Sequence, residues 1–315
     1  DEQGVEALGY VCINRVLGGV LQGALAAANK VDTLCPARIT AVTSGEDRNV
    51  VTVIHDDDRE ESIACTLLVV ADGARSQVRE MLGIGATYVD YEQTAVIGNV
   101  LTELPNHGCA YERFTESGPV AMLPITNGRT AFVWITETRN AEALLAANDA
   151  EFTTKLADAF GTRLGGFSRV GDRSAYPLGL SKALRLTAGR AVLVGNAAHG
   201  LHPVAAQGFN LGLRDVAALC DCIADERSRG TEADIGASAV LADYAAWRKP
   251  DQDKLVAFTD GLIRLFGSRR PGVRALRNVG MLGFDFLPGV RSAFARHTMG
   301  LAGRLPRLSR GIPLA

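Results

Sequence analysis

Residues 189–219 read GRAVLVGNAAHGLHPVAAQGFNLGLRDVAAL, and the rest of the chain is arranged around them. The apolar run at 191–194 predicts a short strand buried in a parallel sheet. After a glycine-bearing loop with two histidines, an apolar-periodic helix is expected to open at 207–210 and to reach about Asp225. A strand, a loop and a helix N-terminus in this order turn backbone N–H groups and the positive end of the helix dipole toward an electron-rich ligand.

Two glycines near the start of the expected helix, Gly208 and Gly212, carry no side chain, so a flat ligand can approach the backbone there. The same residues also fit an ordinary strand–loop–helix connection that uses small residues for packing. On this stretch alone, both interpretations stay open.

A second stretch repeats the pattern. Residues 67–71, LLVVA, form another apolar run, and residues 72–76, DGARS, follow it before a helix expected near Gln77. Two buried strands that each end in a glycine-containing turn predict one α/β sheet, with a ligand at the carboxyl ends of its strands.

The two turns resemble the paired motifs of a known family, the group A FAD-dependent aromatic hydroxylases. Asp72 and Gly73, with Arg75, Ser76 and Arg79, are similar to its DG motif. Residues 195–199, with His202, Pro203, Gln207, Gly208, Asn210, Gly212 and Asp215, are similar to its flavin-binding GD motif. The stretches 5–10, 91–93, 112–115, 121–124 and 173–178 resemble the ubiquinone-biosynthesis branch, and the resemblance extends over nearly the whole chain.

The resemblance implies an α/β (α+β) fold with a Rossmann-like FAD-binding domain, an inserted, mainly antiparallel β-sheet domain for the substrate, and a helical C-terminal region. We assign 1–87 and 185–265 to the FAD-binding domain, 88–184 to the substrate domain and 266–315 to the basic helical region. Periodicity predicts helices at 14–30, 150–160 and 236–266, a β-meander at 38–66, and β runs at 94–102, 109–115, 119–124, 130–136 and 169–177.

In function, the resemblance implies an NAD(P)H- and FAD-dependent monooxygenase. It would hydroxylate a prenylated phenol of ubiquinone biosynthesis with dioxygen, through a flavin C4a-hydroperoxide. Two other functions are compatible with the fold: an FAD-dependent reductase of an isoprenoid, and a non-catalytic scaffold subunit that has lost FAD.

The site residues follow from the two motifs. Because the flavin carries the chemistry, no catalytic side chain is assigned. Backbone groups at 208–210 are expected to favour the anionic reduced flavin, and Asn196 to hydrogen-bond its ribityl chain. Asp72 can instead be a helix N-cap or turn residue. The full cofactor-binding set is Asp72, Gly73, Arg75, Gly195, Asn196, His202, Pro203, Gln207, Gly208, Phe209 and Asn210.

Tyr176, Pro177 and Arg113 are the candidates for contact with the substrate. The structural alternatives are a tyrosine packed at a strand end and a surface ion pair between Arg113 and Glu112. His199 and His202 stand three residues apart in a loop with no obvious carboxylate or cysteine beside them, so no metal site is expected.

The chain departs from the family pattern at two places. Asn196 stands where the GD motif usually has an aspartate; an amide can still hydrogen-bond the ribityl chain, and asparagine resembles the methoxyphenol-hydroxylase subgroup. No G-x-G-x-x-G follows a strand near the start, where the family holds the ADP half of FAD. We therefore expect an amino-terminally truncated chain that lacks the first βαβ unit and binds FAD poorly.

Composition sets the remaining limits. With 47% hydrophobic and 22% charged residues the chain is ordinary for a globular protein, and its six cysteines lack metal or secretory spacing, so we expect reduced thiols in the cytoplasm. From Leu262 onward ten arginines and one acid give +9, which leaves −11 on the rest of a chain whose total is −2. This basic segment suits the surface of the inner membrane or a ubiquinone-pathway complex, or is a solvated tail. Nucleic acid is not expected, because no aromatic strand platform accompanies the arginines.

Overall fold

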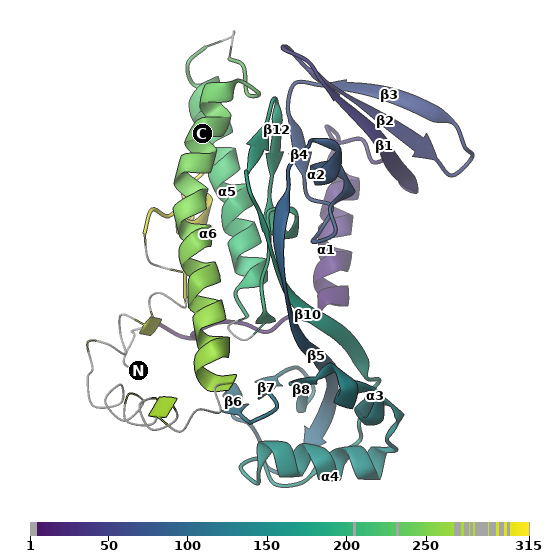
Figure 1. Cartoon of the computed structure of the whole chain (residues 1–315), viewed down its shortest axis with the longest axis vertical. Coiled ribbons are helices and arrows are strands. Elements are labelled where there is room, and N and C mark those ends of the chain that lie inside the picture. The colour runs from purple at the N-terminus through teal and green to yellow at the C-terminus, as the bar shows by residue number, and fades with distance from the viewer. Residues whose placement is uncertain are drawn as a thin grey trace. The chain divides into compact units, whose positions relative to one another are not determined.

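The computed structural model describes residues 5–203, 206–230 and 233–267, and further along 272–273, 277, 280, 289, 294–295, 299–300 and 303–314. The chain, traced in Figure 1, folds into two compact units. One comprises Asp1–Val31, Asp90–Gly179 and Leu262–Ser292, and the other comprises Asp32–Val89, Leu180–Gly261 and Ala293–Ala315. We call them unit 1 and unit 2.

Unit 2 is built on a three-stranded sheet in the order β11 (Thr187–Ala188), β12 (Ala191–Leu193) and β4 (Leu68–Val70). Strands β4 and β12 are parallel, with Leu68 opposite Ala191 and Val70 opposite Leu193. This confirms that the two apolar runs lie in one α/β sheet. Every residue of β12 is fully buried, as expected for a strand covered on both faces.

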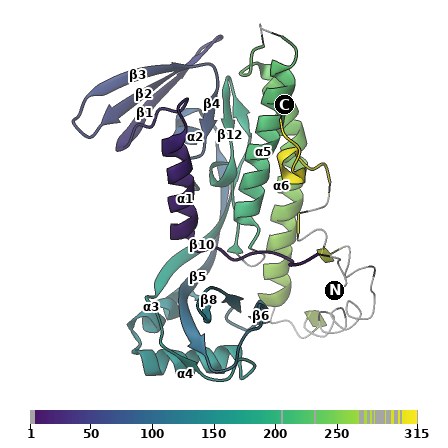
Figure 2. The same ribbon diagram turned by 180° about the vertical axis from the view of Figure 1, so that it is seen from behind.

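Two long helices, α5 (Gly208–Arg227) and α6 (Ser238–Gly267), lie side by side next to this sheet (Figures 1 and 2). The hydroxyl of Tyr244 in α6 donates to the carbonyl oxygen of Leu193 at 3.0 Å, so this buried phenol is satisfied. The short helix α2 (Gln77–Met81) follows β4, and the predicted start at Gln77 is confirmed.

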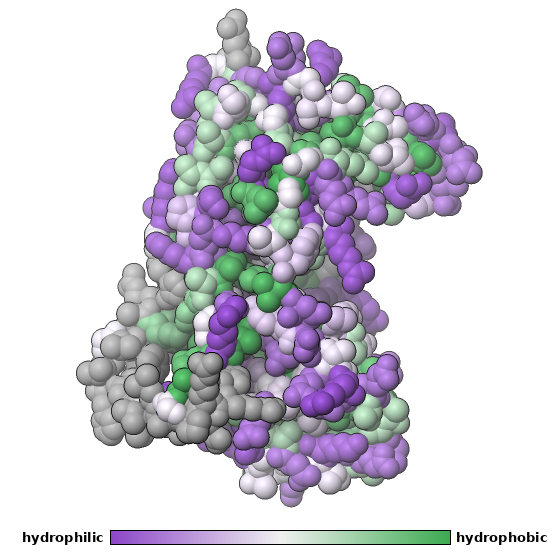
Figure 3. All heavy atoms as spheres, viewed as in Figure 1, coloured by the Kyte–Doolittle hydropathy of each residue, from purple (hydrophilic) through white to green (hydrophobic). Residues whose placement is uncertain are grey.

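The predicted β-meander is also confirmed in unit 2. Strands β1 (Ala37–Ser44), β2 (Asn49–His55) and β3 (Glu60–Cys65) form an antiparallel sheet in that order. Figure 3 shows hydrophilic side chains gathered at the outer end of this sheet. At the β2–β3 turn, the Asp57 carboxylate accepts a hydrogen bond from the backbone N–H of Arg59, as in a solvated hairpin tip.

The described strands of unit 1 belong to a seven-stranded sheet. Its members are β5 (Ala86–Thr102), β6 (Tyr111–Phe114), β7 (Pro119–Pro124), β8 (Arg129–Glu137), β9 (Phe167–Ser168), β10 (Ser174–Ala183) and β13 (His199–Gly200), in the order β13-β10-β5-β8-β7-β6 with β9 beside β5. The pairs β5–β8, β7–β8 and β6–β7 are antiparallel, as predicted. The strand expected at 169–177 was misplaced, because Arg169 adopts φ +48° and ends β9 before β10 begins.

Helices α1, α3 and α4 lie wholly within the described residues of unit 1. Helix α4 (Asp149–Phe160) confirms the prediction at 150–160 and begins with a capping box between Asn148 and Glu151. Helix α3 (Thr138–Ala146) was not predicted. Helix α1 (Asn14–Ala27) confirms the helix at 14–30, but none of its residues is buried, and most of its apolar side chains are exposed.

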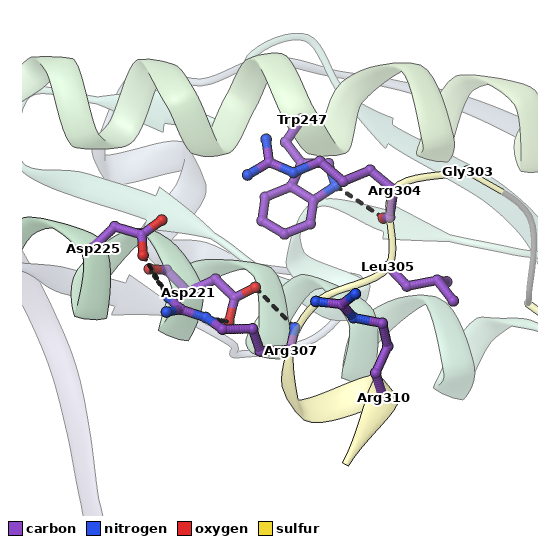
Figure 4. A pocket seen from close by; sticks show the side chains of 8 residues that line it. All are labelled: Asp221, Asp225, Trp247, Gly303, Arg304, Leu305, Arg307 and Arg310. Atoms are coloured by element: carbon purple, nitrogen blue, oxygen red, sulfur yellow. Dashed lines mark hydrogen bonds and ion pairs between the residues drawn. The ribbon is translucent and has the colours of Figure 1, made fainter. Parts of the chain in front are cut away.

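Most of the basic region at 266–315 lies outside the described residues, and so do most of the short helices expected there. Its described end, 303–314, carries the short helix η3 (Leu308–Arg310) and packs on α5 and α6 (Figure 4). Arg307 donates through Nε to Oδ1 of Asp221 at 3.0 Å and through NH2 to Oδ1 of Asp225 at 2.7 Å. Among the described residues, no helix combines the length and apolar character needed to cross a bilayer.

Candidate flavin-binding site

The two turns singled out in the sequence lie next to each other in unit 2. They follow β4 and β12 at the carboxyl ends of adjacent parallel strands, and the backbone N–H of Val194 donates to the carbonyl oxygen of Val70 at 3.0 Å just before them. The structure therefore brings the DG-like turn, which begins at Asp72, beside the GD-like turn, which begins at Gly195. The carboxyl edge of a parallel sheet is where α/β folds usually bind their ligands.

A buried arginine ties the two turns together. Arg79 in α2 is 1% exposed, and its guanidinium NH1 donates to the carbonyl oxygens of Ala197 at 2.9 Å and Ala74 at 3.4 Å. Its NH2 group donates to the hydroxyl of Tyr88. The family motif includes Arg79, but sequence reasoning did not assign it this bridging role.

The carboxylate of Asp72 makes a hydrogen bond within its own turn. It accepts a hydrogen bond from the backbone N–H of Val78 at 3.1 Å, at the N-terminus of α2, while the hydroxyl of Ser76 caps Arg79. Asp72 therefore acts as a turn residue that bonds the first turn of α2, while the N-cap itself is Ser76. Gly73 adopts φ +89°, which glycine tolerates best, and Asp72 and Arg75 remain exposed. Direct contact of these two side chains with flavin stays a prediction.

The turn after β12 is shaped by two glycines that face each other. Gly195 has φ +56° and opens a 3₁₀ turn over Gly195–Ala197, within which Asn196 is exposed. A Cβ placed on Gly212 would lie 3.3 Å from the Cα of Gly195. The expectation that a flat ligand approaches Gly212 is therefore wrong, because the Gly195 backbone fills that space.

The N-terminus of α5 presents the surface that a flat ring needs. Gln207 precedes the helix without a side-chain cap. A Cβ on Gly208 would meet nothing within 4 Å, and the side chains of Phe209 and Asn210 are exposed. Because the first N–H groups of a helix have no intrahelical acceptor and lie at the positive end of its dipole, they favour an anionic ligand.

Both loop histidines are buried. Nε2 of His199 lies 2.6 Å from Oδ2 of Asp215 in the interior of unit 2. His202 is 2% exposed, and its burial lowers the pKa of the ring from 6.5 to about 4, so the ring is neutral near pH 7. Pro203 accepts a hydrogen bond at its carbonyl oxygen from the N–H of Ala206 at 2.8 Å. No cluster of metal-ligating side chains is found among the described residues.

Sequence reasoning passed over the buried contacts of Asp215, although this residue belongs to the motif. It is fully buried and contacts α6 as well as the Gly195 turn. A signal was present: Leu211, Ala218 and Leu219 lie on the same helical face, and a carboxylate on an apolar face needs buried partners.

The three substrate candidates belong to unit 1. Tyr176 lies in β10 with 55% of its surface exposed, so the packed alternative is wrong, and Pro177 beside it is exposed too. Arg113 lies in β6, and a Cβ on Gly161 at the end of α4 would lie 2.5 Å from its NH1. No hydrogen bond or ion pair with Glu112 is found among the described contacts of Arg113. Contact with substrate stays a prediction.

The residues present fit the isoalloxazine and ribityl half of a flavin. They offer an exposed amide at Asn196, open space above Gly208 and, at the start of α5, N–H groups that the Gln207 side chain does not cap, all in unit 2. None of these features involves a redox-active side chain, so the protein would bind and orient the group that carries the chemistry.

Comparison with known proteins agrees with this geometry. Residues 12–259 match the family described as FAD binding domain. The chain is 39% identical over 310 residues to ubiquinone hydroxylase UbiL of Rhodospirillum rubrum, covering 98% of this chain and 71% of that protein. It is 33% identical over 300 residues to 3-demethoxyubiquinol 3-hydroxylase of Escherichia coli, covering 93% and 73%.

Among solved structures, p-nitrophenol 4-monooxygenase PnpA from Pseudomonas putida shares the fold with a TM-score of 0.72 at 19% identity, over 92% of this chain and 72% of that one. The fold is thus the mixed α/β fold of FAD-dependent hydroxylases. With these paired turns and relatives of this identity, the chain belongs to the FAD-binding monooxygenase family, in its ubiquinone hydroxylase branch.

Proposed function

We propose that this chain is the catalytic polypeptide of an FAD-dependent monooxygenase that hydroxylates a prenylated phenol in ubiquinone biosynthesis, with NAD(P)H as reductant. The observation that carries the proposal is the pairing of the Asp72 and Gly195 turns at the carboxyl ends of β4 and β12, next to the N-terminus of α5. The relatives named as ubiquinone-pathway hydroxylases support the substrate class.

In this proposal the bound flavin supplies oxygen activation, and the protein supplies binding and shape. The exposed Asn196 amide holds the ribityl chain, and the N–H groups of Gly208, Phe209 and Asn210 stabilise negative charge on the ring. Buried, neutral His202 and the adjoining Pro203 shape the loop next to this helix start. Arg113, Tyr176 and Pro177 are proposed to contact the phenol.

The decisive experiment has two stages. Titration with FAD, FMN and riboflavin, followed by flavin fluorescence, tests the cofactor half. We expect Asn196→Ala to weaken binding on the order of tenfold with unchanged thermal stability, because the side chain is exposed. Incubation with a prenylated phenol, NADH or NADPH and dioxygen should then give a product with one added oxygen atom. A saturated isoprenoid would favour the reductase, and a chain that never binds flavin would favour the scaffold.

Two further points belong to the proposal. We propose that these 315 residues alone bind FAD little better than FMN, because the sequence offers no G-x-G-x-x-G turn for the ADP half. We also propose that the basic segment after Leu262 contacts anionic lipid of the inner membrane or a pathway partner. Co-sedimentation with anionic vesicles tests the second point, and equal binding after deletion of that segment would contradict it.

A further inference from the structure

A single buried carboxylate joins the flavin-binding turn to both long helices. Asp215 in α5 has no exposed surface. Its Oδ2 accepts the backbone N–H of Gly195 at 3.1 Å and lies 2.6 Å from Nε2 of His199. Its Oδ1 accepts from Nε of Arg248 at 2.8 Å and from Nε2 of Gln252 at 3.0 Å, both in α6. A carboxylate only accepts, so each of these four groups donates.

The division of contacts between the two oxygens is informative. Among the described residues, Oδ2 contacts Gly195 and His199 on the side of the turn, and Oδ1 contacts Arg248 and Gln252 in α6. Gly195 adopts φ +56°, and the exposed Asn196 follows it in the same 3₁₀ turn. Because Gly195 directly precedes Asn196, the hydrogen bond from the Gly195 N–H fixes the backbone that orients the Asn196 side chain.

The surrounding charges let this carboxylate stay ionised. Arg248 donates from NH1 to Oδ2 of Asp251 at 2.7 Å, and NH1 of Arg214 lies 3.2 Å from the same oxygen. Two carboxylates thus face two guanidinium groups. Burial opposes ionisation of Asp215, but the hydrogen bond from His199 and the charge of Arg248 outweigh it and lower its pKa below the usual 3.8.

We propose that Asp215 is a positioning residue for flavin binding, which holds the Gly195–Ala197 turn in its ligand-ready shape through the Gly195 N–H and the His199 ring. The inference rests on the flavin role proposed above for Asn196 and the start of α5. Arg248 and Gln252 in α6 keep the carboxylate charged and oriented, so the flavin turn is anchored to a helix that contributes no residue to the predicted flavin contacts.

Substitution of this carboxylate has a sharply defined consequence. Asp215→Asn replaces one acceptor oxygen with a donor amide, while the Gly195 N–H on one side and the Arg248 guanidinium on the other can only donate. One side of the amide must therefore face donors. In the double variant Asp215→Asn with Gln252→Glu, the new carboxylate can accept from the asparagine amide, which leaves its oxygen for Gly195 and His199. Asp251→Asn is the matched control, because it removes a carboxylate of the same network that does not touch the turn.

The experiment measures the turn and the ligand separately. Hydrogen exchange of the Gly195 amide is followed by NMR without flavin, with the Val194 amide, which bonds Val70 in the sheet, as internal reference. FMN affinity is followed by fluorescence. In Asp215→Asn we expect Gly195 exchange to rise, and FMN affinity to fall, each on the order of tenfold. The double variant should recover most of both, and Asp251→Asn should lower the melting temperature while both readouts stay within about twofold.

Each result decides the proposal. If Gly195 exchange and FMN affinity are unchanged in folded Asp215→Asn, or change equally in Asp251→Asn, the positioning role is wrong. If neither Asp215 variant folds, the residue serves folding itself and the proposal also fails. If the wild-type chain binds no flavin, the proposed flavin function fails instead, while exchange at Gly195 still decides whether Asp215 holds the turn.

Discussion

Gly195 and Gly212 meet backbone to backbone where the turn after β12 crosses the second turn of α5. A Cβ on Gly212 would stand 3.3 Å from the Cα of Gly195, which is itself in a left-handed conformation. A Cβ atom rarely lies that close to another carbon, so the absence of a side chain at Gly212 lets the turn after β12 approach the helix.

Gly212→Ala should therefore destabilise the protein by about 1–3 kcal/mol, because the added methyl group pushes on backbone that cannot rotate away. Gly208→Ala is the matched substitution in the same helix, where a Cβ meets nothing within 4 Å. It should leave stability equal or slightly higher but weaken flavin binding, since the methyl group enters the space proposed for the ring. Urea unfolding and FMN titration separate the two, and equal stability loss in both variants would contradict the packing argument.

Arg79→Met should lower the free energy of unfolding by about 2–4 kcal/mol. The buried carbonyl oxygen of Ala197 loses its donor, and the other acceptors of Arg79 lose its buried guanidinium. Tyr88→Phe removes only the hydroxyl that accepts from Arg79 and should cost less. Thermal or urea unfolding gives both values. If the two substitutions cost the same, the bridge between the turns carries little of the stability.

His202 predicts a defined acid sensitivity. The unfolded chain takes up a proton at this ring near pH 6.5, but the folded chain does so only near pH 4, because burial disfavours the charged ring. Protons therefore favour unfolding between these values. As the pH is lowered through this window, the free energy of unfolding should fall by up to about 3 kcal/mol. His202→Asn should flatten this part of the profile, measured by urea unfolding at a series of pH values. A variant with the same pH slope as wild type would rule out His202 as the cause.

Arg307→Ala should release the C-terminal segment from α5, because Asp221 and Asp225 lose their shared partner. The guanidinium of Arg304 lies 3.8 Å from the ring centre of Trp247, so release should shift the emission of that tryptophan to the red. Trp134 is buried and gives a constant background. Arg310→Ala, which changes a residue of the same pocket, is the control (Figure 4). An identical spectrum in Arg307→Ala would show that the segment stays bound without this ion pair.

Sequence reasoning recovered the elements that carry a strong local signal. The apolar runs before Asp72 and Gly195 were assigned as buried strands of one α/β sheet, since uninterrupted aliphatic runs are typical of strands buried on both faces; the structure shows that they are neighbours. The helix beginning at Gly208 and the meander of β1–β3 were found in the same way. These elements are specified by residues close together in the chain.

What it missed depends on partners far apart in the sequence. The donors of Arg248 and Gln252 reach Asp215 from 33 and 37 positions away, and Arg79 reaches Ala197 across 118. No local pattern specifies such pairings. Gly212 was misread for the same reason: a glycine that avoids a backbone clash and one that opens space for a ligand look alike until the opposing atom, here in Gly195, is known.

The bridge made by Arg79 has a practical meaning for redesign. Because one guanidinium bonds the carbonyl oxygens of Ala74 and Ala197, the two turns are joined directly, across the strands and helices that separate them in the chain. Strands β6–β8 and helix α4 lie in the intervening part and take no part in this bridge, so they can be exchanged to test it. Chimaeras that swap these elements between relatives should keep the bridge, and with it the recipient's affinity for FMN.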